Sequence, residues 1–143
     1  MEAKESWEIW NELLTRSESS ELTAEESIVK RVNVFLFDFE MGGWLYNQSP
    51  EGSEENDWHD LRATADAVEA VGVPSVGEIL RRIATIVESS AFTEPMAWGE
   101  FLDQVDPDDT IGKLNQQISN EIKTLYTALD QFTVKHFRCK ASY

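Results

Sequence analysis

Apolar residues recur at steps of three and four along most of this chain, and this spacing limits the folds that the chain can adopt. Side chains three and four positions apart share one face of an α-helix, whereas a strand needs alternation. The clearest case lies late in the sequence, at Ile111, Leu114, Ile118, Ile122, Leu125, Leu129 and Phe132. We predict one uninterrupted helix there, from about Asp108 to about Phe137 and on the order of 45 Å long.

The same spacing, together with start and stop signals, predicts the other helices. A first helix over residues 3–16 carries Trp7 and Trp10, which with Trp58 and Trp98 are predicted to anchor the core or an interface. The other predicted elements are a helix from a cap at Asp57 to a stop at Gly72 and Pro74, a helix from a Ser75–Glu78 capping box to Val87, and a short helix from Pro95.

Helix and strand compete in the segment 28–41, where Val32, Val34 and Leu36 alternate as in a strand. However, Thr23 followed by Glu26 is a capping box, which marks a helix start. The apolar residues also form two helical stripes, one of Ile28, Val32, Phe35, Leu36 and Phe39 and another of Val34, Phe37 and Met41. We therefore predict a central helix that is buried on two sides and ends in a left-handed cap at Gly42.

The chain has 143 residues, of which 41% are apolar, and this is enough for one domain with a substantial core. No repeat or low-complexity linker divides it, so we expect one domain over residues 1–143. The predicted fold is all-α, a single compact domain of about six helices with a long C-terminal helix. The predicted core contains Phe35, Leu36, Phe39, Leu61, Ile79, Leu80, Ile83, Leu125 and Leu129.

The formal net charge of −15 is unevenly distributed. Residues 38–60 carry seven acids and residues 94–109 carry six, in both cases without a lysine or arginine. Such a field repels nucleic acids and anionic membranes and attracts basic proteins, although simple solubility is an alternative explanation. The predicted partner-binding residues are Glu51, Glu54, Glu55, Asp57, Asp60, Glu100, Asp103, Asp106, Asp108 and Asp109.

Composition also indicates the compartment. A single cysteine, Cys139, excludes an intrachain disulfide, which fits a reducing cytoplasm. The first ten residues are acidic and amphipathic, unlike a signal peptide, and charges interrupt every apolar run before it could cross a membrane. We expect a cytoplasmic protein without direct contact to membranes or nucleic acids.

Residues that could carry catalysis are few. His59 lies among acids at a helix start, where an acid-paired surface histidine is favoured over a metal ligand, and His136 is predicted to pack at the edge of the core. Cys139 follows His136 by one helical turn, but a helix C-terminus disfavours a thiolate. The stretch "DPDDTIG" lacks the glycine and the final glutamate of a calcium loop. We expect no enzymatic activity, metal or cofactor.

Two stretches, "FDFEMGGWLYNQSP" and "ATADAVEAVGVPSVGEILRRIA" (residues 63–84), carry a family resemblance. The first matches the DNA-mimic protein family of the neisserial type in kind at Glu40, Gly42, Gly43, Trp44, Tyr46, Asn47 and Ser49. The second is similar to the helix end and the "ILRR" that follow in that family. The resemblance covers about residues 25–90, but Met41 replaces the asparagine before the glycines and the segment between Trp44 and Ser49 is shorter.

The resemblance implies an all-helical, dimeric fold in which Gly42, Gly43 and Trp44 shape a turn. In the named member of the family, surface carboxylates take the place of DNA phosphates on a basic transcription factor. Our leading hypothesis is therefore a non-enzymatic acidic module that binds a basic protein, with DNA mimicry as its mode. An immunity or antitoxin-like protein that neutralises a basic toxin is the alternative, and a small metal-dependent hydrolase using His59 is an alternative of another class.

Overall fold

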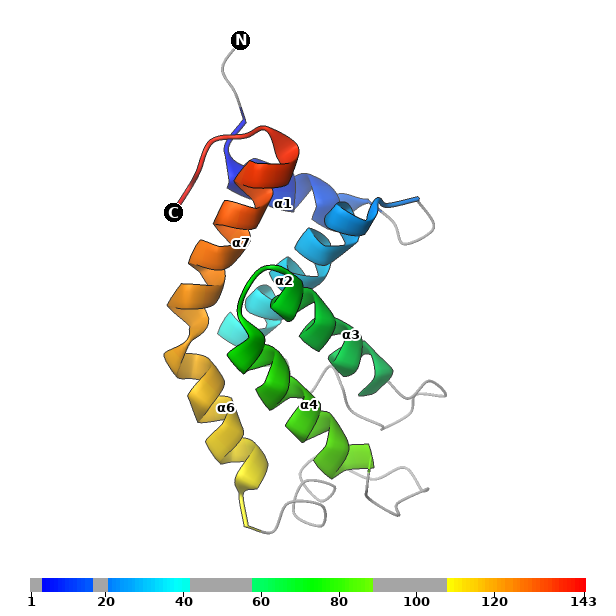
Figure 1. Cartoon of the computed structure of the whole chain (residues 1–143), viewed down its shortest axis with the longest axis vertical. Coiled ribbons are helices and arrows are strands. Elements are labelled where there is room, and N and C mark those ends of the chain that lie inside the picture. Colours follow the sequence, from blue (N-terminus) through cyan, green and yellow to red (C-terminus); the bar gives the residue numbers. More distant parts are fainter. Residues whose placement is uncertain (1–3, 17–20, 42–57, 89–107) are drawn as a thin grey trace.

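The computed structural model describes residues 4–16, 21–41, 58–88 and 108–143 (Figure 1). The helices in these ranges are α1 (Ser6–Thr15), α2 (Ala24–Glu40), α3 (Trp58–Ala70), α4 (Pro74–Glu88), α6 (Thr110–Asn120) and α7 (Ile122–Phe137). Extended pairing in the same ranges is limited to one bridge between Glu5 and Lys140. The predicted all-α fold is confirmed. Among the helices described, none has both the length and the apolarity needed to cross a bilayer.

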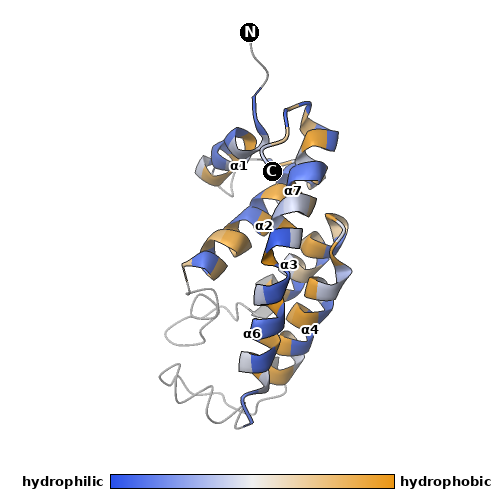
Figure 2. Cartoon of the chain, turned by 90° about the vertical axis from the view of Figure 1, so that its left-hand side faces the viewer, coloured by the Kyte–Doolittle hydropathy of each residue, from blue (hydrophilic) through white to orange (hydrophobic). Residues whose placement is uncertain are grey.

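Helix α2 lies in the middle of the arrangement and contacts α1, α3 and α7. Helices α3 and α4 form an antiparallel pair, and α4 packs against α6. Helices α6 and α7 follow one side of the molecule, so the start of α6 and the end of α7 lie at opposite ends (Figure 1). Hydrophilic and apolar residues occur together in the helices, as expected for helices that pack through one face (Figure 2).

The start of α2 confirms the predicted capping box. The Thr23 hydroxyl accepts a hydrogen bond from the Glu26 N–H at 3.1 Å, and the Glu26 carboxylate accepts one from the Thr23 N–H at 2.9 Å. Two N–H groups that a helix start leaves without partners are thereby satisfied. The choice of helix over strand for the segment 28–41 is confirmed as well.

The prediction that α2 is buried on two sides is wrong. Val32 and Leu36 on the first stripe are fully buried, whereas Val34, Phe37 and Met41 on the second stripe are exposed by 37%, 59% and 72%. Because α2 packs through one face only, its other face carries an apolar stripe at the surface. The predicted cap at Gly42 lies outside the described residues.

The α3–α4 turn follows from Gly72, whose φ of +104° is the left-handed conformation that glycine tolerates best. The N–H of Gly72 donates to the Glu69 carbonyl at 2.9 Å and that of Val73 to the Val68 carbonyl at 3.2 Å, which is a Schellman motif. Helix α4 then begins at Pro74 rather than at a capping box of Ser75 and Glu78. The predicted box is wrong because proline suits the first helical position, where no N–H partner exists.

The prediction of one uninterrupted last helix is wrong, because the helix breaks at Glu121 into α6 and α7. Glu121 has φ −112° and ψ 6°, and its N–H donates to the Ile118 carbonyl at 2.9 Å instead of continuing the helical pattern. Its carboxylate oxygens accept the Ser75 hydroxyl hydrogen bond from α4, each at 2.9 Å. The apolar stripe nevertheless continues across the break, with Ile118 and Leu125 both fully buried.

Most of the predicted core is confirmed. The buried members are Phe35, Leu36, Leu61, Ile79, Leu80, Ile83, Leu125 and Leu129, while Phe39 is partly buried against them. Helix α1 begins at Ser6 rather than at residue 3, and only Trp10 of its two tryptophans is buried, because Trp7 is 44% exposed. The predicted short helix from Pro95 and Trp98 lie outside the described residues, as does the predicted cap at Asp57.

Candidate functional site

Most predicted partner-binding acids lie outside the described residues. These are Glu51, Glu54, Glu55, Asp57, Glu100, Asp103 and Asp106, and the side chain of Asp60 in α3 is not described either. Asp108 and Asp109 are exposed at the start of α6. They are therefore the two members of the predicted set whose surroundings can be described.

Asp109 sits at the N-cap position of α6 with the left-handed φ of +56°. Its side chain does not bond to the helix N–H groups but lies against Gly112, where an added Cβ would come within 2.2 Å of the Asp109 Oδ1. Gly112 thus leaves the space that this carboxylate occupies. Within the described ranges, no group of three or more acid, histidine or cysteine side chains is arranged to hold a metal ion.

Of the family-motif residues, Glu40 is described, and it is exposed at the end of α2. The other members, Gly42, Gly43, Trp44, Tyr46, Asn47 and Ser49, lie outside the described ranges. Burial raises the pKa of the Tyr126 hydroxyl, and its hydrogen bond to the Glu40 carboxylate raises that pKa further. Glu40 therefore connects the end of α2 to α7.

The charge is divided between the helices and the segments that join them. The described ranges contain all twelve lysines and arginines but 17 of the 27 acids, so the remaining ranges hold ten acids and no base. Residues 42–57 and 89–107 contribute four acids each. Residues 42–57 join α2 to α3, and residues 89–107 lie between α4 and α6 in the sequence.

Several bases of the helices already have acidic partners. The Arg81 guanidinium bonds to the Asp66 carboxylate at 2.5 Å and to the Glu69 carboxylate, and it holds the pKa of the Glu69 carboxyl below its ordinary value. Arg16 pairs with Glu26 across the α1–α2 connection at 2.5 Å. These exposed pairs contribute little stability, but they neutralise charge within the helical part of the molecule.

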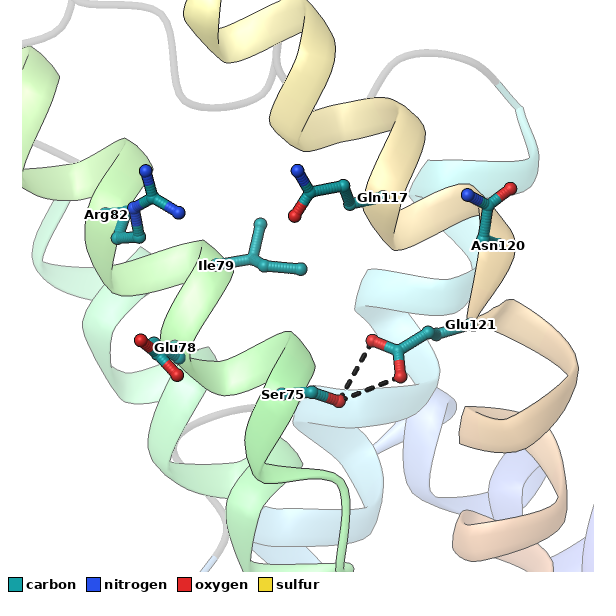
Figure 3. Close-up of a pocket in the computed structure, with 7 residues that line it drawn as sticks. All are labelled: Ser75, Glu78, Ile79, Arg82, Gln117, Asn120 and Glu121. Atoms are coloured by element: carbon teal, nitrogen blue, oxygen red, sulfur yellow. Dashed lines mark hydrogen bonds between the residues drawn. The ribbon is translucent and has the colours of Figure 1, made fainter.

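A groove of about 380 Å³ lies between α4 and the α6–α7 break (Figure 3). Its lining residues are Ser75, Glu78, Ile79, Arg82, Gln117, Asn120 and Glu121. Ile79 forms an apolar floor, and the Ser75 hydroxyl is held by the Glu121 carboxylate. The lining contains no histidine or thiol that could take a proton from Ser75, so these side chains suit binding of a polar group rather than nucleophilic catalysis.

The histidine and cysteine candidates differ in their surroundings. His136 is exposed, but its ring lies 4.3 Å from the partly buried ring of Phe132, at the edge of the core as predicted. Burial raises the pKa of the Cys139 thiol, and the nearby Asp130 carboxylate raises it further. A thiolate is thus disfavoured at Cys139, as predicted, but the causes are burial and the Asp130 carboxylate rather than the helix C-terminus. The side chain of His59 is not described.

Sequence reasoning missed a buried polar network between the two ends of the described chain. Asp130 on α7 is 1% exposed, and its Oδ1 accepts hydrogen bonds from the Ser6 hydroxyl and, at 2.9 Å, from the Ser142 N–H. The Trp10 indole N–H donates to the Thr133 hydroxyl at 2.8 Å. Ser6 and Asp130 are 124 positions apart, so the sequence offered no signal beyond an aspartate next to the buried Leu129.

Comparison with known proteins found no match among family models, curated proteins or solved structures. The resemblance to the DNA-mimic family therefore stays a prediction from the sequence.

Proposed function

We propose that this protein is a non-enzymatic acidic binding protein that occupies the basic surface of a protein partner in the manner of a DNA mimic. The observation that carries the proposal is the separation of charge between the helices and the joining segments. Ten acids lie in segments that contain no base, and eight of them lie in residues 42–57 and 89–107. DNA offers a DNA-binding protein the same quality, a dense negative charge without intervening positive groups.

The distribution of the bases supports the proposal. Arg81 and Arg16 are paired with acids of neighbouring helices. Lys135, Arg138 and Lys140 are exposed near the end of α7, at the opposite end of the molecule from the start of α6. The acids of residues 42–57 and 89–107 have no lysine or arginine among them in the sequence, and the long-range field of such acids favours encounter with a basic partner.

The proposal is tested by capturing partners from a lysate of the source cells with wild-type protein and two charge-reversal variants. The first variant carries Glu54→Lys and Glu55→Lys, and the second carries Asp103→Lys and Asp106→Lys. The matched control carries Glu21→Lys and Glu78→Lys, which change the net charge equally at exposed positions of the helical part. Captured proteins are identified by mass spectrometry at about 0.1 M and about 1 M salt, where the Debye lengths are about 10 and 3 Å.

We expect wild-type protein and the control to retain basic DNA-binding proteins at low salt, and at least one joining-segment variant to lose them. Double-stranded DNA should compete for the same captured protein, because DNA and a protein that mimics it bind the same surface of their partner. A captured basic protein that DNA does not displace would favour the antitoxin-like alternative. Equal capture by all variants at both salt concentrations would contradict the proposal and leave solubility as the role of the acids.

A further inference from the structure

Residues 138–143, here called the closing segment, dock against a surface that resembles a peptide-recognition site. The Lys140 N–H donates to the Lys4 carbonyl and the Ser6 N–H donates to the Lys140 carbonyl, both at 2.8 Å. These two bonds form a parallel bridge, which is how a sheet edge receives an extended peptide. The docking surface, here called the clasp site, consists of Lys4, Ser6, Trp10, Tyr126 and Asp130.

The clasp site contains a buried carboxylate, that of Asp130, which binds the backbone of Ser142 in the closing segment. The Asp130 Oδ1 accepts the Ser142 N–H at 2.9 Å, and the hydroxyls of Ser142 and Ser6 lie 2.9 Å apart. The Trp7 N–H also donates to the Ser142 hydroxyl, at 3.2 Å. A backbone N–H and a hydroxyl at this position are therefore both recognised.

An aromatic residue fills the next position of the closing segment. The Tyr143 ring stacks on the Trp10 ring at 5.6 Å and 12°, and it lies 5.4 Å from the Tyr126 ring. Together the two rings of the clasp site form a platform for one aromatic side chain. The segment that fits is thus extended, with a serine-like residue followed by an aromatic one.

The closing segment is only lightly held. Tyr143 stays 65% exposed in spite of its stacking, and Lys140 and Ala141 are exposed as well. Arg138, where the segment leaves α7, has the left-handed φ of +51°, which is unfavourable for a residue other than glycine. A segment that buries little apolar surface opens at a lower free energy than the core.

We infer that the clasp site is a recognition site for an extended peptide of a protein partner, with a serine or threonine followed by an aromatic residue, and that the closing segment is its resident occupant. When the closing segment leaves, the Asp130 carboxylate loses the Ser142 N–H and keeps the Ser6 hydroxyl, and the loss of a donor to a carboxylate costs free energy. A peptide that supplies the same donor and an aromatic ring removes that cost. This site goes beyond the proposed function, because it would bind a peptide through Asp130 and two aromatic rings rather than a basic surface through the acids of residues 42–57 and 89–107.

The test uses a fluorescent hexapeptide with the sequence of residues 138–143 and serine in place of Cys139, and a scrambled peptide as control for charge attraction. In the full chain, Ser142→Pro removes the N–H that Asp130 accepts and so frees the clasp site. The matched control is Ala141→Pro, because no hydrogen bond of the Ala141 N–H to the described residues is found and Lys140 is already extended. Circular dichroism verifies that both variants fold.

Fluorescence anisotropy should show that Ser142→Pro binds the hexapeptide about ten-fold more tightly than wild type or Ala141→Pro, because an occupied site is available only in its open fraction. Adding Ser6→Ala to Ser142→Pro should abolish this increase in affinity, because the Ser6 hydroxyl contacts the serine of the bound segment. A folded Ser142→Pro variant that binds the hexapeptide no better than wild type, or no better than the scrambled peptide, would overturn the inference.

A measurement on wild-type protein keeps the inference testable if Ser142→Pro does not fold. Cys139 is the sole cysteine and lies partly buried in the closing segment, so its alkylation rate reports opening. The hexapeptide should capture the open form and accelerate alkylation in proportion to its concentration, whereas the scrambled peptide should not. Equal rates with both peptides would show that the closing segment does not exchange with a free peptide.

Discussion

The α3–α4 hairpin and the clasp site are held together by different kinds of interaction. The hairpin is a local structure in which Leu61, Val68 and Leu80 are almost completely buried and a glycine turn joins its two helices. The clasp site joins residues more than 120 positions apart through Asp130 and the Ser6 hydroxyl. Apolar area stabilises the hairpin, whereas directional polar bonds fix the closing segment.

The difference has a consequence for how the molecule responds to change. Removing atoms from the hairpin leaves a cavity that the packed interior cannot close, so the whole fold loses stability. Removing a donor or an acceptor from the clasp site leaves polar groups without partners, which should weaken the docking of the closing segment and cost less than a cavity in the core. The substitutions below are ordered from the largest expected effect to the smallest, and the first two test the two sides of this contrast.

Leu80→Ala should have the largest effect. The Leu80 side chain is fully buried between α4 and the core, so its truncation should lower the free energy of unfolding by about 2–5 kcal/mol. Leu14→Ala is the matched control, because Leu14 is 39% exposed and should lose much less. Urea denaturation followed by circular dichroism measures both. A loss below about 1 kcal/mol for Leu80→Ala would contradict the burial of the hairpin.

Asp130→Ala tests the polar side of the contrast. The substitution leaves the Ser6 hydroxyl and the Ser142 N–H without their acceptor, which should cost about 1–3 kcal/mol of unfolding free energy. Asp38→Ala on α2 is the control, since Asp38 is only partly buried, and its effect should stay within about 0.5 kcal/mol. An Asp130→Ala variant as stable as wild type would show that burying the carboxylate costs as much as its bonds contribute.

Thr23→Ala removes the hydroxyl that caps the start of α2, and it should lower the free energy of unfolding by about 1 kcal/mol.

Glu26→Gln tests the other half of the capping box. The hydrogen bond from the Thr23 N–H lowers the pKa of the Glu26 carboxyl below its ordinary value, and Arg16 lowers it further. A depressed carboxyl pKa adds stability above the unfolded pKa, and this stability is lost as the pH falls through the folded pKa. Glu26→Gln should therefore destabilise the protein near neutral pH and weaken the loss of stability below about pH 4. The melting temperatures of wild type and Glu26→Gln are measured across pH. The same fall of melting temperature at low pH in both proteins would contradict this account.

The smallest expected effect is kinetic and concerns Cys139. Burial raises the pKa of the Cys139 thiol, and the Asp130 carboxylate raises it further. The rise of the alkylation rate with pH should therefore occur at higher pH than for a free cysteine. Asp130→Asn should shift this profile to lower pH, because asparagine removes the negative charge and keeps an oxygen that can accept hydrogen bonds. Unchanged profiles in the two proteins would mean that the carboxylate does not influence the thiol.

The sequence predicted those elements whose signals are local. The Thr23–Glu26 box, the stop at Gly72 and the spacing of Leu61, Leu80 and Leu125 all act within a few positions or within one helix face. The predicted second buried stripe of α2 failed for a different reason. Apolar spacing identifies a face but not whether another element covers it, and Phe37 remains exposed.

Features that depend on distant partners could not be predicted. The break at Glu121 has no glycine or proline, and its carboxylate bonds to Ser75, which is 46 positions away. The clasp site likewise depends on contacts between residues 4–6 and 140–142. The candidate acids were chosen from composition, and of these Asp108 and Asp109 fall among the described side chains. Their role thus remains a proposal about charge.

The central claim is that the acids of the joining segments serve a basic partner, and association kinetics test it most directly. Stopped-flow mixing of a captured partner would compare wild type, Glu54→Lys with Glu55→Lys, and the Glu21→Lys with Glu78→Lys control. We predict that the joining-segment variant lowers the association rate far more than it raises the dissociation rate, with a difference that shrinks as salt screens the field. Association rates that fall equally in the variant and in the control, or that do not change with salt, would contradict the claim.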